Sequence, residues 1–510
     1  MNLLFHGGTI RTLDPAGPSP ATLVLAGEEV AETARSDAQR IDLEGRCVVP
    51  GLADAHVHFP TWSLGLRQAR LEGARSLDDA LASVTEARPR VAPGGWLRGL
   101  GWRDGDWPEP PTRWALDRVS GDLPAALMSR DYHSLWLNSA ALAQADGPLD
   151  RPGGVVERDE RGEPTGILRE TSAWAFRDRY VKPTLGEMVE ASREGMRLAA
   201  ARGVTAIHDK DGWLGSLEVH QRLLADGDLK VRVWQSLPWE RLEELTTLGL
   251  RSGYGAPMLR LGYLKGFMDG TLGSATALLL DGSGVQITSS EALEDVVRRA
   301  AAAGWPVAVH AIGDGANRAA LDAFERSQDA WREAGLRPRI EHAQLLADEE
   351  FDRFGALGVA ASVQFSHAPS DRDLADRLWE GRRGAYAYRS LLDSGALLAN
   401  GSDAPVEELD PLAGIAAAVR RSLDERPPWR PEQALTVDEA LRASCLAPAW
   451  LEGEERRRGM LSPGMLADLV VLDRDPYTCP PEALGAIRVE ATMVGGRWTY
   501  RSEGWGLPAT

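Results

Sequence analysis

The stretch LADAHVHFP (residues 52–60) places two histidines one residue apart at the end of an apolar run. Side chains at positions i and i+2 of a β-strand point to the same face, so the imidazoles of His56 and His58 can converge on one ion. The chain has 9 histidines in 510 residues, and at that frequency chance alone gives about 0.16 such pairs. The pair by itself is weak evidence, so its meaning depends on the polar residues at the ends of other strands.

Short apolar segments recur along the chain, and most end in a polar residue followed by a helix-like stretch. Eight such segments cover residues 52–58, 204–209, 231–237, 261–269, 307–314, 338–344, 359–366 and 397–403. The stretch between 289 and 304 illustrates the intervening helices, with a serine to cap its start, an apolar stripe and a glycine at its end. Strands alternating with helices predict an α/β fold, a parallel (β/α)8 barrel (TIM barrel) with catalytic groups at the carboxyl ends of its strands. A doubly wound sheet is the competing architecture.

Two regions do not follow this alternation of strands and helices. Residues 1–50 and 455–510 contain short alternating strands separated by turn residues, and they predict a small β-sandwich built from both termini, with the barrel over 51–454. About 140 residues separate the first two barrel strands, far more than a βα loop requires, so an inserted subdomain is expected at about 60–195. Its tryptophans either roof a pocket or form the core of the insertion; they are Trp62, Trp96, Trp102, Trp107, Trp114, Trp136 and Trp174.

The composition excludes several classes of protein. There are 57 basic and 75 acidic residues, a formal net charge of −18, which has the wrong sign for binding nucleic acid. The cysteines, Cys47, Cys445 and Cys479, lie far apart and predict neither a disulfide framework nor a thiolate metal site. Residues 1–14 lack the basic segment of a signal peptide, and no stretch reaches the ~18 apolar residues of a membrane span. We expect a soluble cytoplasmic protein, with a homodimer as an open expectation for its assembly.

Further polar residues end other predicted strands: Lys265 the fourth, His310 the fifth, His342 the sixth and Asp403 the eighth. Taken alone, Lys265 is typical of a surface lysine with a buried aliphatic stem. At one barrel mouth with histidines and an aspartate, it has another interpretation, because a neutral amine can take up CO₂. The resulting carbamate is an anion able to bridge two cations.

This order of residues resembles the metal-dependent amidohydrolase superfamily. The stretches DAHVHF, RDYHSLWLNS, GEPTGILRE, LKGFMDGTLGS, VHAIGDGAN, RIEHAQ and GSDAPVEELDP resemble its amidohydrolase family 3 branch, which includes N-substituted formamide deformylases, as does the ending GMLSPGMLADLVVLDRDP with TMVGGRW. The resemblance implies a β-sandwich beside a barrel and hydrolysis of a carbon–nitrogen bond at a divalent metal site, usually zinc. The implied ligands are His56, His58 and Asp403 for a first ion, His310 and His342 for a second, and a carboxylated Lys265 between them. Whether one or two ions bind, and whether Lys265 is modified, stays open at this point.

The chemistry expected at such a site is hydrolytic. Zinc lowers the pKa of its bound water from 15.7 to about 7 and polarises the substrate carbonyl. Asp403 is the expected general base, which accepts a proton from that water and passes it to the leaving amine. The predicted substrate is a small molecule with an amide, N-formyl or cyclic amide bond. The alternatives are deamination of a ring amine at the same site and a catalytically silent scaffold, which has no need to keep all six ligand-type residues.

Several other polar residues have two interpretations. His133 in RDYHSLWLNS, Glu170 in GEPTGILRE and His367 after the seventh strand are candidate substrate-binding residues, and a structural hydrogen bond is the alternative for each. Asp269 and Asp314 precede glycines, for which a turn-forming role is expected.

Overall fold

The computed structural model describes residues 2–15, 17, 19–91, 94–102, 107–129, 134–152, 154–273 and 275–505. The chain divides into two compact units, one made of Met1–Phe59 with Met196–Thr510 and the other of Pro60–Gly195. Among the described helices, none is long and apolar enough to cross a membrane.

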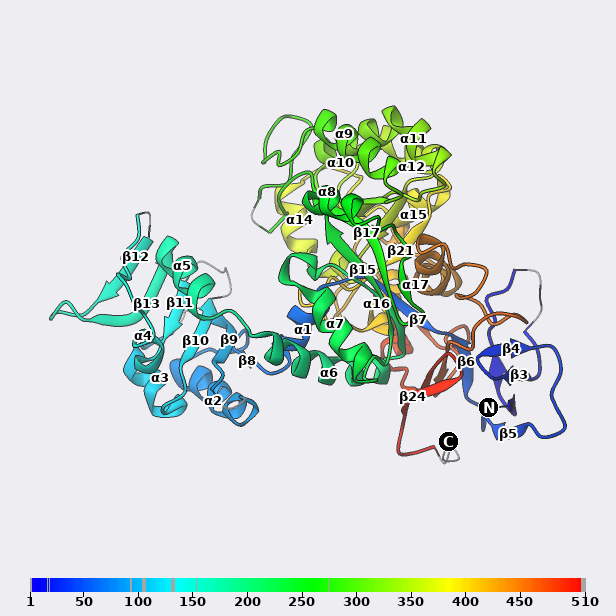
Figure 1. The fold of residues 1–510 in the computed structure, drawn as a ribbon, viewed down its shortest axis with the longest axis horizontal. Coiled ribbons are helices and arrows are strands. Elements are labelled where there is room, and N and C mark those ends of the chain that lie inside the picture. Colours follow the sequence, from blue (N-terminus) through cyan, green and yellow to red (C-terminus); the bar gives the residue numbers. More distant parts are fainter. Residues whose placement is uncertain are drawn as a thin grey trace. The chain divides into compact units, whose positions relative to one another are not determined.

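Eight parallel strands form the barrel of the first unit (Figure 1). In order around the barrel they are β7 (Leu52–Val57), β14 (Val204–Asp209), β15 (Arg232–Pro238), β17 (Leu259–Phe267), β18 (Val307–Ala311), β19 (Arg339–His342), β20 (Ala360–Val363) and β21 (Leu398–Asn400), with the short β16 (Gly255–Ala256) beside β17. At the carboxyl ends of β7 and β21, the amide of Asp403 donates to the carbonyl of His56 at 2.7 Å, and the amide of His58 donates to the carbonyl of Ala404 at 2.9 Å. These bonds join the first strand to the last, so the predicted barrel is confirmed and the doubly wound sheet is excluded.

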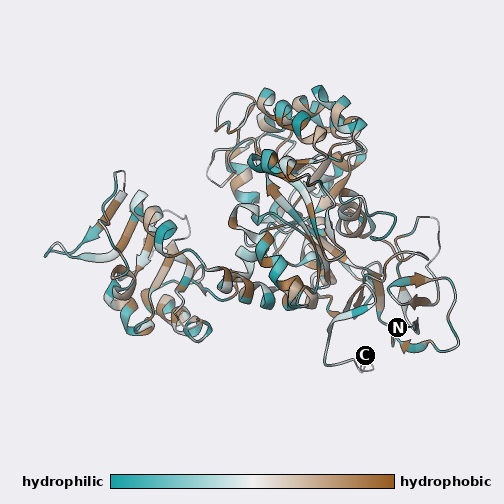
Figure 2. Ribbon diagram, viewed as in Figure 1, coloured by the Kyte–Doolittle hydropathy of each residue, from teal (hydrophilic) through white to brown (hydrophobic). Residues whose placement is uncertain are grey.

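Helices follow the barrel strands along the chain. Those within the first unit are α7 (Ser216–Ala225), α8 (Leu242–Thr247), α9 (Ser290–Ala302), α10 (Asp314–Arg326), α11 (Gln328–Glu333), α12 (Phe351–Leu357), α13 (His367–Ser370), α14 (Arg372–Leu378), α15 (Tyr388–Asp393), α16 (Pro411–Arg420) and α17 (Val437–Leu451). In α9 the hydroxyl of Ser289 accepts the amide of Ala292 at 3.2 Å, which satisfies a helix N-terminus. Its apolar stripe, including Leu293 and Val297, is buried against the barrel, whereas outward positions are polar (Figure 2).

Both chain termini build the small β-domain, as predicted. One sheet has the order β4 (Glu29–Ala31), β3 (Leu23–Ala26), β1 (Asn2–His6) and β5 (Gln39–Asp42). The other has the order β2 (Thr9–Ile10), β6 (Cys47–Pro50), β22 (Leu469–Leu472), β23 (Val489–Val494) and β24 (Arg497–Arg501). Phe5, Leu25, Val48, Leu469 and Met493 are buried in one cluster, so side chains from both sheets share a core.

The second unit contains a six-stranded sheet inserted after the first barrel strand. Its strand order is β12 (Gly154–Arg158), β13 (Pro164–Glu170), β11 (Ser134–Leu137), β10 (Ala125–Ser129), β9 (Leu97–Trp102) and β8 (Ala69–Arg70). Its helices are α2 (Leu77–Ala87), α3 (Arg113–Ser120), α4 (Ser139–Leu142) and α5 (Thr171–Tyr180), while α1 (Phe59–Gly65) and α6 (Leu185–Ala201) carry the chain in and out. Trp102, Trp107 and Trp136 are buried with ring centroids 6.2–6.4 Å apart, so these three tryptophans form part of the core of the insertion.

A buried ion pair joins the barrel to the β-sandwich. Arg232, at the start of β15, binds Asp468 through two bonds of 2.8 and 2.9 Å, and Asp468 also accepts the amide of Gly495 at 2.7 Å. Burial alone raises the pKa of a carboxyl, but the charge of Arg232 holds the pKa of Asp468 below its usual value. The pair therefore stabilises the fold at neutral pH, and this contribution is lost as the pH falls below about 4 and through the lowered pKa.

We predict that Asp468→Ala lowers the free energy of unfolding by about 3–5 kcal/mol, because the guanidinium of Arg232 would stay buried without its partner. Urea denaturation at pH 7 measures the change. Glu243→Ala is the control: it removes the exposed carboxylate 3.2 Å from Arg299 and should cost at most about 1 kcal/mol. Equal effects of the two substitutions would contradict the prediction.

Candidate metal centre

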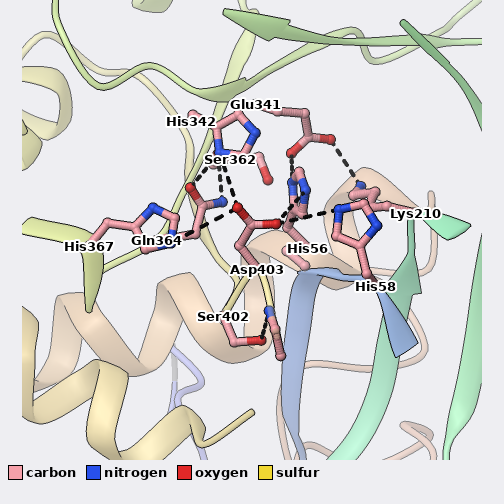
Figure 3. Close-up of polar contacts among 12 residues, drawn as sticks. His56, His58, Lys210, Glu341, His342, Ser362, Gln364, His367, Ser402 and Asp403 are labelled. Carbon is pink, nitrogen blue, oxygen red and sulfur yellow. Dashed lines mark hydrogen bonds and ion pairs between the residues drawn. The ribbon is translucent and has the colours of Figure 1, made fainter. Parts of the chain in front are cut away.

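The two histidines at the end of β7, His56 in the strand and His58 directly after it, are each held by a carboxylate. Nδ1 of His56 lies 2.8 Å from Oε2 of Glu341, and Nδ1 of His58 lies 2.8 Å from Oδ1 of Asp211. The opposite nitrogens, both Nε2, lie 3.3 and 3.5 Å from the same oxygen, Oδ1 of Asp403 (Figure 3). The pair therefore aims both Nε2 atoms at one point, as the strand spacing predicts.

His56, His342 and Asp403 form a compact buried group in which one ligand atom from each lies within 4.8 Å of the others. His342 and Asp403 have left-handed backbones, with φ of 75° and 58°. Consecutive residues of a regular strand point to opposite faces, but the left-handed turn at His342 lets Glu341 and His342 both face the barrel axis. Such backbones cost of order 1–3 kcal/mol each and persist where the surrounding structure holds them, typically at functional sites.

His310 and Lys265 lie beside this group. Nε2 of His310 is 2.9 Å from the carbonyl of Gly270, which leaves Nδ1 for another partner, and its ring centroid is 4.6 Å from that of His342. Lys265 is buried, and its Nζ has no hydrogen-bond partner among the residues that the structure describes. Burial lowers the pKa of Lys265 to about 8, although Glu341 and Asp403 act in the opposite direction. Its amine therefore loses a proton much more readily than an exposed lysine does.

The electrostatics of the site suit a divalent cation. Burial lowers the pKa of His56 and of His342, and burial together with the charge of Lys265 lowers the pKa of His310 to about 3. Burial also acts to raise the pKa of Asp403, but the neighbouring imidazoles hold that pKa well below its usual value. Burial acts to lower the pKa of His58, but the hydrogen bond and charge of Asp211 raise it. The other three imidazoles are held neutral and Asp403 is held anionic, which are the ligand forms that zinc binds, so these residues fit such an ion.

The residues predicted to bind substrate lie in different parts of the chain. His367, on α13, is buried with Nε2 3.9 Å from Oδ2 of Asp403, and its ring is parallel to that of His342 at 6.5 Å. His133 lies outside the described residues, and Glu170 ends β13 in the second unit, where its side chain is not described.

Asp269 and Asp314 bind backbone amides, but neither forms the turn expected of it: Asp269 makes an isolated bridge with Gln286, and Asp314 begins α10. Asp269 accepts the amides of Leu278, Ile312 and Gly313 at 2.9–3.0 Å, and Asp314 accepts the amide of Leu280 at 2.9 Å. Both carboxylates thus organise the loops after β17 and β18.

Sequence reasoning did not single out Glu341, Asp211, Lys210 or Gln364, which contact the predicted ligands or one another. Gln364 lies 2.8 Å from Nδ1 of His342, and Lys210 lies 2.9 Å from Glu341. The sequence did contain a signal for the charged residues among these, because charged residues in or directly after strongly apolar strands are rarely buried unless they are paired. Strand periodicity, however, places Glu341 on the face opposite His342.

Comparison with known proteins identifies relatives over almost the whole chain. A family model described as Amidohydrolase family matches residues 39–500. Protein LONG AFTER FAR-RED 3 of Arabidopsis thaliana is 32% identical over 543 residues, covering 98% of this chain and 91% of the relative. The N-substituted formamide deformylase of Arthrobacter pascens is 28% identical over 540 residues, covering 99% of each.

A solved structure matches the fold closely. The crystal structure of an uncharacterized metal-dependent hydrolase from Pyrococcus furiosus is 29% identical in sequence, with a TM-score of 0.78. The match covers 94% of this chain and 100% of the other.

We predict that the purified chain carries about one to two equivalents of a divalent transition metal, most readily zinc, because the converging ligand atoms are those of a zinc site. Elemental analysis of protein prepared without chelator measures it. His342→Ala should lower the metal content, whereas His6→Ala, in the β-sandwich, should leave it unchanged. Well under half an equivalent, with no uptake of added zinc, would contradict the site.

Proposed function

This chain belongs to amidohydrolase family 3, and on that premise we propose that it hydrolyses a carbon–nitrogen bond of a small amide, N-formyl or cyclic amide at a divalent metal centre. The family predicted from the sequence motifs is thereby confirmed. The observation that carries the proposal is the convergence of two Nε2 atoms, 3.3 and 3.5 Å away, on one oxygen of a buried anionic aspartate. A full-length relative named an N-substituted formamide deformylase supports an amide or N-formyl bond as the target.

The proposed ligands divide between two adjacent positions. Nε2 of His56 and of His58 with Asp403 would hold one zinc ion, and Nδ1 of His310 with Nε2 of His342 are the nitrogens left for a second. Lys265 would lie between them as a carbamate. Its Nζ, which is buried and has no hydrogen-bond partner in the described ranges, supports this, because a carbamate removes the ammonium charge and supplies anionic oxygens for cations.

A bound divalent cation would supply a water of lowered pKa and would polarise the substrate carbonyl. Asp403 is the proposed general base, and its low pKa keeps its carboxyl group in the anionic form that a base requires. The same carboxyl then protonates the leaving amine and returns to its anionic form, so that one residue serves both steps.

The proposed substrate contacts extend away from Asp403. His367 has a buried Nε2 without a hydrogen bond in the described part of the chain, 3.9 Å from Oδ2 of Asp403. We propose that this nitrogen binds a polar group of the substrate next to the scissile bond. His133 and Glu170 remain proposed substrate contacts on the strength of their motifs.

The function is tested with a panel of N-formyl, N-acyl and cyclic amides, together with ring amines, using zinc-loaded protein. We predict turnover of a member of the amide classes, and a loss of about 10²–10⁴-fold in turnover per bound metal for Asp403→Asn, the range of positioned acid–base catalysis. His310→Ala, with excess zinc, should change turnover per metal less, since its proposed role is to hold an ion. Release of ammonia from ring amines alone would favour a deaminase, and near wild-type turnover per metal in Asp403→Asn would assign the proton transfer to another residue.

We predict that carboxylation of Lys265 rises between pH 7 and pH 9. With a pKa of about 8, roughly one tenth of the amine is neutral at pH 7 and nine tenths at pH 9, and only the neutral amine adds CO₂. Protein incubated with zinc and ¹³C-bicarbonate should give a carbamate ¹³C resonance that is absent from Lys265→Met. Lys230→Met, which removes a half-buried lysine that is not part of the metal centre, should keep the resonance, and a wild-type protein without the resonance would contradict the prediction.

A further inference from the structure

Charged side chains fill the barrel interior beneath the candidate metal centre, where branched aliphatic residues usually pack. Glu341 lies at the centre of this group and is completely buried. Its Oε2 lies 2.8 Å from Nδ1 of His56, and its Oε1 lies 2.9 Å from Nζ of Lys210 and 2.7 Å from Nε of Arg339. β19, which carries Glu341, pairs with neither β7 nor β14, so the contacts with His56 and Lys210 cross the barrel (Figure 3).

We propose that Glu341 is a positioning residue of the metal centre, and that Lys210 and Arg339 hold it so that it fixes the tautomer and orientation of His56. This role rests on the proposed function, because it concerns how one of its ligands is presented to the ion.

The geometry of the His56 contact supplies the first argument. A neutral imidazole has one nitrogen that donates and one that accepts, and an ionised carboxylate only accepts. The carboxylate of Glu341 therefore places the proton of His56 on Nδ1 and leaves the lone pair on Nε2. That lone pair is directed to the region of Asp403, 3.3 Å away, where a cation would lie.

The two cations supply the second argument. Lys210 and Arg339 both contact Oε1 of Glu341, which leaves Oε2 free to accept from His56. Arg339 is itself held by the carbonyl of Ala55 at 3.1 Å, and both cations contact the hydroxyl of Tyr263. Glu341 therefore has little freedom to rotate, and neither cation donates to a proposed ligand side chain among the bonds described.

The same buried network continues away from the metal centre and offers a matched control. Arg339 contacts Nδ1 of His208 at 2.9 Å. Nε2 of His208 lies 2.8 Å from Oε1 of Glu452, and the carboxylate of Glu452 also forms an ion pair with Arg458. Glu452 is thus a second buried carboxylate with one histidine and one cationic partner. Unlike Glu341, it contacts no proposed metal ligand.

The experiment compares Glu341→Gln with Glu452→Gln in the full-length chain. Zinc affinity is measured on metal-free protein by competition with a chelator. Glu341→Gln keeps the side-chain volume but turns an amide NH₂ toward donor groups, so we expect zinc binding about 10–100-fold weaker than in the wild type. Glu452→Gln should stay within about threefold of the wild type, because its carboxylate does not touch a ligand. Equal zinc affinity in wild type and Glu341→Gln would overturn the positioning role.

Cobalt(II) provides a readout that a general loss of stability would not produce. The visible spectrum of the cobalt-loaded protein should change in Glu341→Gln and stay as in the wild type in Glu452→Gln. If Glu341→Gln does not fold, zinc binding by Lys210→Met tests the proposal instead, because this substitution removes one of the donors that hold Glu341. Weaker zinc binding in Lys210→Met supports the proposal, and unchanged or tighter binding overturns it. A wild-type chain that binds no zinc would instead overturn the metal centre itself.

Discussion

Two backbone hydrogen bonds close the barrel, and the candidate site exists because of them. The amides of Asp403 and His58 donate to the carbonyls of His56 and Ala404 at 2.7 and 2.9 Å, across the join between the first and last strands. Gly401 permits this approach, because a Cβ at its position would lie 2.4 Å from the amide nitrogen of His56. The carboxylate of Asp54 reinforces the join by accepting the amides of His56 and Ser402, both at 3.0 Å. The same contacts that close the barrel therefore also bring the ligand residues together.

The charged side chains inside this barrel serve the placement of the metal ligands more than they serve the stability of the fold. Apolar packing lies mainly between strands and outer helices, where one continuous cluster includes residues such as Leu293, Phe324 and Ile340. Inside, Glu341, Lys210 and Arg339 remain charged or polar without access to water. Well-packed apolar residues in place of a buried ion pair are often neutral or stabilising, so stability alone is a weak reason to keep these charges. Glu341 contacts His56, and Lys210 and Arg339 contact Glu341, so these charges have a role that concerns the metal centre.

Much of the architecture follows from local patterns. A parallel strand covered on both faces is an apolar run, and a polar residue at its carboxyl end stands out, which is why all eight barrel strands were predictable from segments such as 204–209 and 307–314. The length between the first two strands predicted the insertion, since a βα loop needs only about 2–6 residues. Turn residues between short alternating strands predicted the sandwich, which the pairing of β6 with β22 confirms.

The sequence by itself determined the order of elements and the fold class, because these depend on residue type and local spacing. The resemblance of its motifs indicated the family and the candidate ligands, which are His56, His58, Lys265, His310, His342 and Asp403. Only the tertiary structure decided what surrounds those ligands. Strand alternation directs Glu341 away from His342, and a backbone φ of 75° at His342 turns both toward the barrel axis. The contacts of Glu341 with His56 and Lys210 then cross the barrel between strands that are far apart in sequence and not paired in the sheet. No periodicity along the chain encodes such a contact, because it forms only when the closed barrel brings those strands face to face.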